Sequence, residues 1–190
     1  MNSGSRPRIY LAGPEVFLTE AKEIGIVKQR LCDEHGFEGL FPLDASLDLT
    51  GLSKSESARR IALANEALMR SADAVIANMT PFRGASMDAG TAYEVGFMRA
   101  LGKPVLGYSN ASGDYAARAR AFRQLPPLSF DCDHPSVEIE NFGLAENLMI
   151  AIAVHESGTD VVVNDIGNRE RMSGLTGFRD CLVMLRQQLN

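Results

Sequence analysis

Short apolar runs alternate with amphipathic stretches along the first hundred residues of the chain. The apolar runs predict buried strands at 8–12, 40–41, 74–77 and 105–106. The stretches between them place apolar residues at helical spacing, and they predict helices at about 17–35, 57–71 and 89–101. A βαβαβαβ order of this kind is typical of a parallel sheet that helices cover on both faces.

The second half of the chain continues this pattern less regularly. Residues 115–124 and 142–154 predict helices, residues 125–140 hold three prolines and predict an irregular segment, and residues 161–163 predict a late strand. The last predicted helix has an apolar stripe at 3-4-3-4 spacing, made by Leu175, Phe178, Leu182, Leu185 and Leu189. Core packing is the first interpretation of this stripe, and a subunit contact is the second.

The stretch from Ala72 to Val105 predicts one strand–loop–helix–strand unit, and Glu94 is its most unusual residue. Residues three or four apart share a helix face, so Glu94 lies on the apolar stripe with Phe97 and Met98. A buried carboxylate without a partner is costly, so this position needs a reason. Two interpretations stay open: a core glutamate bonded to a neighbouring hydroxyl or amide, or a catalytic carboxylate.

Two aspartates of the same unit have structural interpretations as well as functional ones. Asp88 directly precedes the predicted helix, where an N-cap residue belongs. Asp73 opens the strand and could serve only as a polar edge residue. Ligands of open parallel sheets bind outside the carboxyl ends of the strands. The segments 13–17 and 78–88 follow the first and third strands and lie at that edge. We therefore expect the carboxylates of Asp73, Asp88 and Glu94 to converge there with Tyr10.

The composition restricts the class of protein. The chain has 190 residues, 45% hydrophobic residues and a net charge of −5, which fits one α/β domain over 1–190. No basic stripe points to nucleic acid, and no apolar run approaches the roughly 20 residues that span a membrane. The start of the chain has no secretion signal, and the three cysteines lie far apart. We therefore expect a cytoplasmic protein with reduced thiols.

The sequence predicts neither a bound nucleotide cofactor nor a metal. The turn after the first strand reads LAGP, which is not a GxGxxG or Walker A loop. Pro14 also lacks the amide that such a loop would offer to a phosphate. His35, His134 and His155 are scattered without metal-ligand spacing.

Four stretches, in order, resemble the nucleoside 2-deoxyribosyltransferases. They read IYLAGPEVF, DAVIANMTPFRG, DAGTAYEVGFMRALGKPV and FGLAENLMI, and the resemblance covers about residues 8–154. Residues 157–190 carry no landmark of that family. The resemblance implies a flavodoxin-like, doubly wound parallel five-stranded sheet with helices on both faces. It also implies a two-step transfer of 2-deoxyribose between the bases of deoxynucleosides.

The resemblance assigns roles to the three residues that would carry the chemistry. Glu94 would be the nucleophile that holds the deoxyribose as a covalent ester. Asp73 would be the general acid for the departing base and then the general base for the acceptor. Tyr10 would orient the carboxylate of Glu94. This chemistry agrees with the bond that breaks, because a carboxylate stabilises or captures the positive charge that builds up on the sugar.

The resemblance also assigns substrate contacts. Asp88 would bind the 5′-hydroxyl of the sugar, and Phe17 would flank the base. Gly13, Arg83 and Gly84 lie in loops around the site. Asn147 and Met149 would reach into the site of a neighbouring subunit, so we expect a homodimer or a higher homo-oligomer with shared active sites.

Two alternatives stay open. The first is hydrolysis by a deoxynucleoside 5′-monophosphate N-glycosidase, but the charge of Asp88 would repel a phosphate. The second is a flavodoxin-like domain that binds or signals without catalysis. A signalling receiver domain would carry an acidic cluster after the first strand, where this chain has Ala12, Gly13 and Pro14.

Overall fold

A computed structural model describes residues 6–44, 47–124, 138–167 and 170–189 of the chain. Five parallel strands form one sheet in the order β2-β1-β3-β4-β5. The strands are β1 (Arg8–Ala12), β2 (Glu38–Leu40), β3 (Ala74–Asn78), β4 (Val105–Ser109) and β5 (Val162–Val163). This is the flavodoxin-like order, and it confirms the predicted fold. The order reverses between β1 and β3, so the carboxyl ends of these two strands border the expected ligand crevice.

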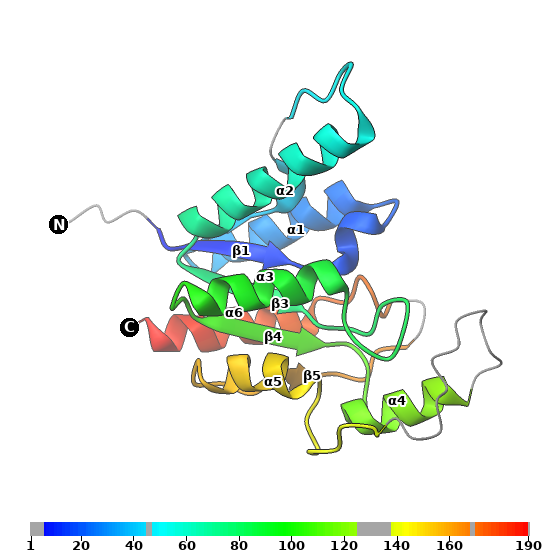
Figure 1. Cartoon of the computed structure of the whole chain (residues 1–190). Coiled ribbons are helices and arrows are strands. Elements are labelled where there is room, and N and C mark those ends of the chain that lie inside the picture. Colours follow the sequence, from blue (N-terminus) through cyan, green and yellow to red (C-terminus); the bar gives the residue numbers. More distant parts are fainter. Residues whose placement is uncertain (1–5, 45–46, 125–137, 168–169, 190) are drawn as a thin grey trace.

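Helices cover both faces of the sheet (Figure 1). The first face carries α1 (Ala21–Glu34) and α6 (Thr176–Gln188), and the second carries α2 (Lys54–Ser71), α3 (Ala89–Ala100) and α5 (Leu148–His155). The short α4 (Tyr115–Arg123) lies beyond the carboxyl ends of the strands (Figure 1). Two 3-10 turns, η1 (Pro14–Phe17) and η2 (Pro42–Asp44), follow β1 and β2.

Alternate residues of each strand point to opposite faces, and this divides the core in two. In β1, Ile9 and Leu11 pack toward α1 and α6, where Phe178, Leu182 and Leu185 are fully buried. Tyr10 and Ala12 point the other way and join the cluster that contains Val95 and Met98 of α3. The last helix therefore belongs to the core, as its apolar spacing indicated.

Several element boundaries differ from the sequence prediction. The helix expected at 142–154 begins only at Leu148, because Asn147 caps it by accepting a hydrogen bond from the amide of Met149 (3.0 Å). The helix expected from residue 57 begins earlier, at Lys54, because the hydroxyl of Ser53 accepts from the amide of Glu56 (3.1 Å). The helix expected at 17–35 begins at Ala21, after the turn η1. The irregular segment expected at 125–140 lies mostly outside the described residues.

None of the helices in the described ranges is both long enough and apolar enough to cross a bilayer.

Candidate active site

A tyrosine and a glutamate from adjacent layers meet at the centre of the site. The phenol of Tyr10 in β1 donates a hydrogen bond to Oε1 of Glu94 in α3, with 2.5 Å between the two oxygens. Tyr10 is fully buried and Glu94 is partly buried. The structure thus brings these two predicted residues together, and α3 presents Glu94 to the sheet as its helical spacing predicted.

The surroundings of Glu94 oppose its ionisation. Burial and the nearby carboxylates of Asp88 and Glu15 raise the pKa of Glu94 to about 7, although the bond from Tyr10 acts in the opposite direction. Burial and the Glu94 carboxylate also raise the pKa of Tyr10, which keeps its phenol protonated. A carboxylate with a pKa near neutrality, held by a neutral donor, is typical of an active site.

Asp88 lies at the N-terminus of α3 and caps it. Its Oδ2 accepts from the amide of Thr91 (3.1 Å) and from the hydroxyl of the same residue (3.4 Å). Both bonds end on Oδ2, so within the described ranges Oδ1 has no hydrogen-bond partner. The cap interpretation is therefore confirmed, and it leaves one oxygen of Asp88 available to a ligand.

An aromatic stack joins two loops at the carboxyl edge of the sheet. The ring of Phe17 stacks on that of Phe82, with 5.5 Å between centroids and 11° between planes. The guanidinium of Arg83 lies 4.9 Å from the Phe17 centroid and 4.6 Å from the Phe82 centroid. Arg83 has a φ of 56°, which is uncommon for a residue with a side chain. The stack therefore holds Arg83 in a strained backbone conformation beside Phe17, which is more than half exposed.

A second buried glutamate, Glu15, was not among the predicted site residues. It is fully buried after β1, and its Oε1 accepts hydrogen bonds from Nζ of Lys28, from Nδ2 of Asn78 (3.0 Å) and from the phenol of Tyr108 (3.1 Å). Its Oε2 is buried without a partner in the part of the chain that the structure describes. The signal was present in the sequence, because Lys28 lies on the buried face of α1 with Gly25 and Leu31.

Glu15 also explains why residue 13 is a glycine. A Cβ added to Gly13 would lie 1.9 Å from Oε2 of Glu15 and 2.9 Å from Cβ of Asn78. No side chain fits there without moving the buried carboxylate. Gly13 therefore serves close packing of the turn beside Tyr10, which is a structural role next to its predicted substrate contact.

The structure does not bring Asp73 into this site. Asp73 precedes β3, and its Oδ2 accepts a hydrogen bond from the amide of Arg8 (2.7 Å), while its own amide donates to the carbonyl of Arg8 (2.7 Å). Arg8 is the first residue of β1, so both residues lie at the amino edge of the sheet. The predicted general acid is thus tied to the edge opposite the one where Asp88 caps α3 and the loop that follows β1 begins.

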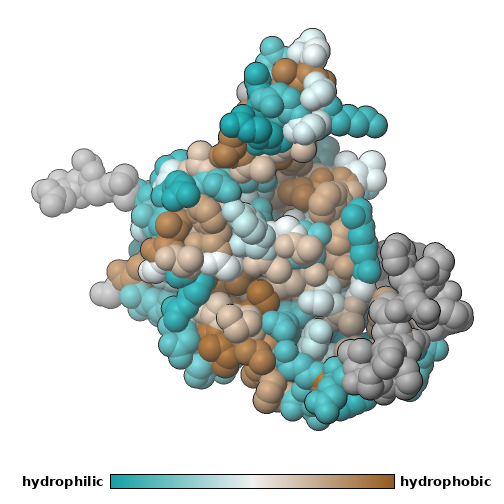
Figure 2. Space-filling model, in the orientation of Figure 1, coloured by the Kyte–Doolittle hydropathy of each residue, from teal (hydrophilic) through white to brown (hydrophobic). Residues whose placement is uncertain are grey.

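Asn147 and Met149 lie on the outer surface beside an apolar patch. Met149 is 72% exposed, and Ile152 and Phe142 are also exposed. Figure 2 shows this patch over α5. The side chain of Asn147 donates to Oε2 of Glu140 (2.9 Å), and its Oδ1 caps α5. Neither residue forms a hydrogen bond to Tyr10, Asp88 or Glu94 in the described part of the chain, and the side chain of Met149 is open to solvent.

The described residues hold no group of three or more histidine, cysteine, aspartate or glutamate side chains that could bind a metal ion. The carboxylates of the site instead have tyrosine, amide or lysine partners.

The chain is similar in sequence and in overall structure to known proteins. The chain is 34% identical to an uncharacterised protein of Schizosaccharomyces pombe, over 96% of this chain and 92% of the other. Its structure is similar to that of the 2-desoxiribosyltransferase of Leishmania mexicana, with a TM-score of 0.67 and 29% identity over 95% of this chain and 97% of that one. A conserved protein of Enterococcus faecalis shares the fold at 18% identity, with a TM-score of 0.55 over 95% of this chain and 99% of that one.

The match at the level of the family covers the elements that build the site. A sequence model described as nucleoside 2-deoxyribosyltransferase matches residues 9–149. This range runs from β1 to the start of α5, and it includes Tyr10, Asp88 and Glu94. The chain therefore belongs to the nucleoside 2-deoxyribosyltransferase family.

Proposed function

We propose that this protein transfers 2-deoxyribose between the nucleobases of deoxynucleosides, through a covalent ester on Glu94. The observation that carries the proposal is the Tyr10–Glu94 pair, because it combines a carboxylate of raised pKa with a fixed orientation. Membership of the family and the similarity to the Leishmania mexicana enzyme support the same reaction.

In the first step, Glu94 attacks the anomeric carbon of the sugar. The bond between this carbon and the base nitrogen breaks, the base leaves with the electron pair and takes up a proton from the solvent, and an ester forms between the sugar and Glu94. Tyr10 supports the step because its phenol holds Oε1, which leaves Oε2 to attack. Asp73 is not part of this proposal, since it is bonded to Arg8 at the other edge of the sheet.

In the second step, a nitrogen of the incoming base attacks the same carbon. The ester bond breaks, the carboxylate of Glu94 is restored, and the acceptor loses its proton to the solvent. Water in place of the base would give hydrolysis, so the two reactions share the intermediate and differ only in the acceptor. The products therefore distinguish transfer from hydrolysis.

Asp88 should make the enzyme prefer nucleosides over their 5′-monophosphates. Its Oδ1 can accept a hydrogen bond from a 5′-hydroxyl, and a charged acceptor makes such a bond worth roughly 1.5–3 kcal/mol. A 5′-phosphate carries about −1.5 to −2 charges, and one unit charge repels another by about 4 kcal/mol at about 4 Å and an effective dielectric near 20. We expect at least a hundredfold preference for deoxyinosine over its monophosphate.

We also propose that subunits share their sites, because the exposed apolar patch of Phe142, Met149 and Ile152 lies beside the half-buried Asn147. A neighbouring subunit would bury this apolar surface and place Asn147 at the rim of the other site. The proposal therefore includes a homodimer or a higher homo-oligomer.

The test is base exchange with purified protein, deoxyinosine and a panel of acceptor bases, with the new nucleosides recorded by chromatography. The proposal predicts exchange products, whereas release of hypoxanthine alone would identify a hydrolase. A 2-fluorinated deoxynucleoside should add the mass of its sugar to the peptide that holds Glu94. A label on another peptide, or no label in an active preparation, would contradict the covalent intermediate.

The role of Asp88 has its own test in the ratio of kcat/KM for deoxyinosine and for its 5′-monophosphate. Asp88→Ser keeps a side chain that can cap α3, so the fold should survive. The ratio should fall by at least tenfold in this variant. If the wild type prefers the monophosphate, or if the ratio is unchanged in the variant, Asp88 does not bind the sugar and serves only to cap α3.

A further inference from the structure

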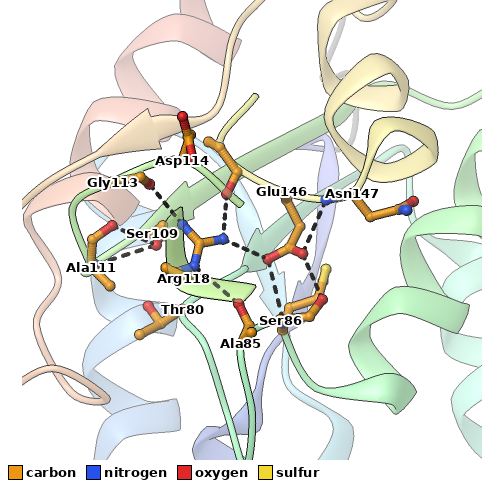
Figure 3. A network of polar contacts seen from close by, with 12 residues as sticks. Thr80, Ala85, Ser86, Ser109, Ala111, Gly113, Asp114, Arg118, Glu146 and Asn147 are labelled. Carbon is orange, nitrogen blue, oxygen red and sulfur yellow. Dashed lines mark hydrogen bonds and ion pairs between the residues drawn. The ribbon is translucent and has the colours of Figure 1, made fainter. Parts of the chain in front are cut away.

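The polar network around Arg118 and Glu146 has no part in the reaction as described so far (Figure 3). Arg118 lies in α4 and Glu146 directly precedes the cap of α5, so they come from separate elements. Nη2 of Arg118 lies 3.2 Å from Oε2 of Glu146, and their side chains are 12% and 1% exposed. Removing a pair of charges from water costs free energy, so this buried pair needs an explanation that a solvent-exposed ion pair would not need.

Glu146 holds the loop that leads into Asp88. Its Oε1 accepts from the hydroxyl of Ser86 (2.6 Å), and its Oε2 accepts from the amide of Met87 (3.3 Å). The next residue in the chain is Asp88. Because Met87 itself is buried, a shift of its amide would move the carboxylate that we assign to the sugar.

Glu146 also holds the segment that leads into α5. Its Oε1 accepts from the amide of Asn147 (3.1 Å). One carboxylate thus bonds directly to the residue before Asp88 and to Asn147 itself. The loop before Asp88 and the residue Asn147, which we assign to the neighbouring site, are therefore both hydrogen-bonded to the carboxylate of Glu146.

Arg118 fixes this carboxylate and the loops around it. It donates to the carbonyls of Ala85 (3.0 Å), Gly113 (2.8 Å) and Ala145 (2.6 Å), as Figure 3 shows. All three carbonyls belong to loops, and a planar guanidinium can hold several acceptors in one fixed geometry. Arg118 therefore connects the loop before Asp88, the loop before α4 and the segment before Asn147.

We propose that Arg118 and Glu146 are positioning residues that set Asp88 in their own site and Asn147 for the site of the adjacent subunit. The inference rests on the proposed function, because it assigns Asp88 to the sugar and Asn147 to a shared site. Asp88 and Asn147 are assigned to substrate binding and not to bond breaking, so loosening this connection should weaken binding and thereby lower kcat/KM.

The first test is the division between KM and kcat in Glu146→Gln and Arg118→Lys. Both changes preserve size, and both weaken the network. We expect the KM for deoxyinosine to rise at least tenfold while kcat changes by less than about threefold, because binding to the sugar is lost in the ground state and in the transition state alike. A purely structural role would instead reduce the active fraction, which lowers the apparent kcat and leaves KM unchanged.

Lys103 offers a matched control. Its Nζ donates to the carbonyls of Met69 (2.9 Å), Arg70 (2.6 Å) and Ala72 (2.5 Å) and so also ties one cation to three backbone acceptors. It lies just before β4, at the amino edge of the sheet. Lys103→Met should lower stability and leave KM at the wild-type value. An equal rise of KM in this variant, or a wild-type KM in both network variants, would overturn the proposal.

The second test separates the two directions of action by mixing subunits. In a mixed dimer of Glu94→Ala and Glu146→Gln chains, the working site keeps the altered Asp88 loop but receives Asn147 from an intact chain. We expect its KM to fall at least threefold below that of the Glu146→Gln homodimer without reaching the wild-type value. Full recovery would contradict the action on Asp88, and no recovery in proven mixed dimers would contradict the action on Asn147.

The third test does not depend on activity, so it separates this inference from the proposed function. Amide hydrogen exchange should accelerate at both Met87 and Asn147 in Arg118→Lys and in Glu146→Gln, because one carboxylate protects both amides. Acceleration at only one of them, or at neither, would refute the connection even if the wild type transfers deoxyribose. A wild type without base exchange would refute the proposed function and leave this measurement intact.

Discussion

Two glutamates lie close together in this protein, and their burial and their partners differ. Glu15 is fully buried and accepts from a lysine, an amide and a phenol. Among the residues that the structure describes, no cation forms an ion pair with Glu94, and its hydrogen bond comes from the neutral phenol of Tyr10. A cation stabilises a carboxylate in its ionised state, whereas a neutral donor leaves it free to react. The two carboxylates thus differ in the kind of partner that holds them, and the proposed nucleophile is the one with a neutral partner.

The largest effect should follow from removing the carboxylate that has no cation. Glu94→Ala should reduce base exchange by at least about a thousandfold, since it removes the nucleophile, while its circular dichroism stays that of the wild type. Asp73→Asn is the matched control, and it should stay within a few-fold of the wild-type rate. A folded Asp73→Asn protein without activity would contradict the placement of Asp73 outside the site.

The next effect concerns the contribution of the Lys28–Glu15 ion pair to the stability of the folded protein. Lys28→Met leaves the carboxylate of Glu15 buried without its cation, and breaking a buried pair in this way costs about 3–5 kcal/mol. Urea unfolding at pH 7 measures the change in the free energy of unfolding. The double variant Lys28→Met/Glu15→Gln should recover part of the loss because it removes the unpaired charge. If the free energy of unfolding falls by less than about 1 kcal/mol in the single variant, Lys28 does not offset the cost of burying the charge of Glu15.

Removing the phenol that holds Glu94 should have a smaller effect with a particular dependence on pH. The bond from Tyr10 lowers the pKa of Glu94, so Tyr10→Phe should move this pKa upward from about 7. We expect kcat/KM at pH 7 to fall about tenfold or more, with a rising limb of the pH profile that is displaced to higher pH. An unchanged limb would show that Tyr10 does not set the ionisation of the nucleophile.

The smallest effect is a gain in stability. The folded protein holds the proton of Glu94 more tightly than the unfolded chain does between about pH 4.5 and 7, so this group destabilises the wild type as the pH rises through that window. Glu94→Gln carries no such penalty. It should be more stable than the wild type by about 1–3 kcal/mol at pH 8, and the difference should shrink toward pH 4.5. A difference that stays constant with pH would argue against the raised pKa.

The sequence predicted the sheet well because its strands are short apolar runs closed by turns. β1 was predicted with its observed bounds at 8–12. The helical spacing of α3 predicted that Glu94 faces the sheet, and it does. The partner of Glu94 could not come from spacing, since Tyr10 is 84 residues away; the family resemblance supplied it. Local patterns define faces of elements, but they do not define contacts between them.

The position of Asp73 at the amino edge of the sheet could have been predicted from the sequence, although the family resemblance assigned this residue to the site. A residue directly before a strand lies at the amino edge of a parallel sheet, whereas a residue directly after one lies at the carboxyl edge. This rule places Asp73 opposite the site without any coordinates. The start of α5 was harder, because residues 142–147 have an apolar spacing that fits a helix. The side chain of Glu146 instead turns inward to Arg118, a contact that no local pattern reveals.

The packing of α6 bears on which part of the chain can fold by itself. The match to the family ends at residue 149, yet Phe178, Leu182 and Leu185 of α6 are fully buried against the sheet. The side chain of Asn110 also donates to the carbonyls of Arg171 and Gly174 (both 2.9 Å). A fragment cut at residue 149 would expose one apolar face of β3 and β4 to water. The unit that folds cooperatively is therefore longer than the unit by which the family is recognised.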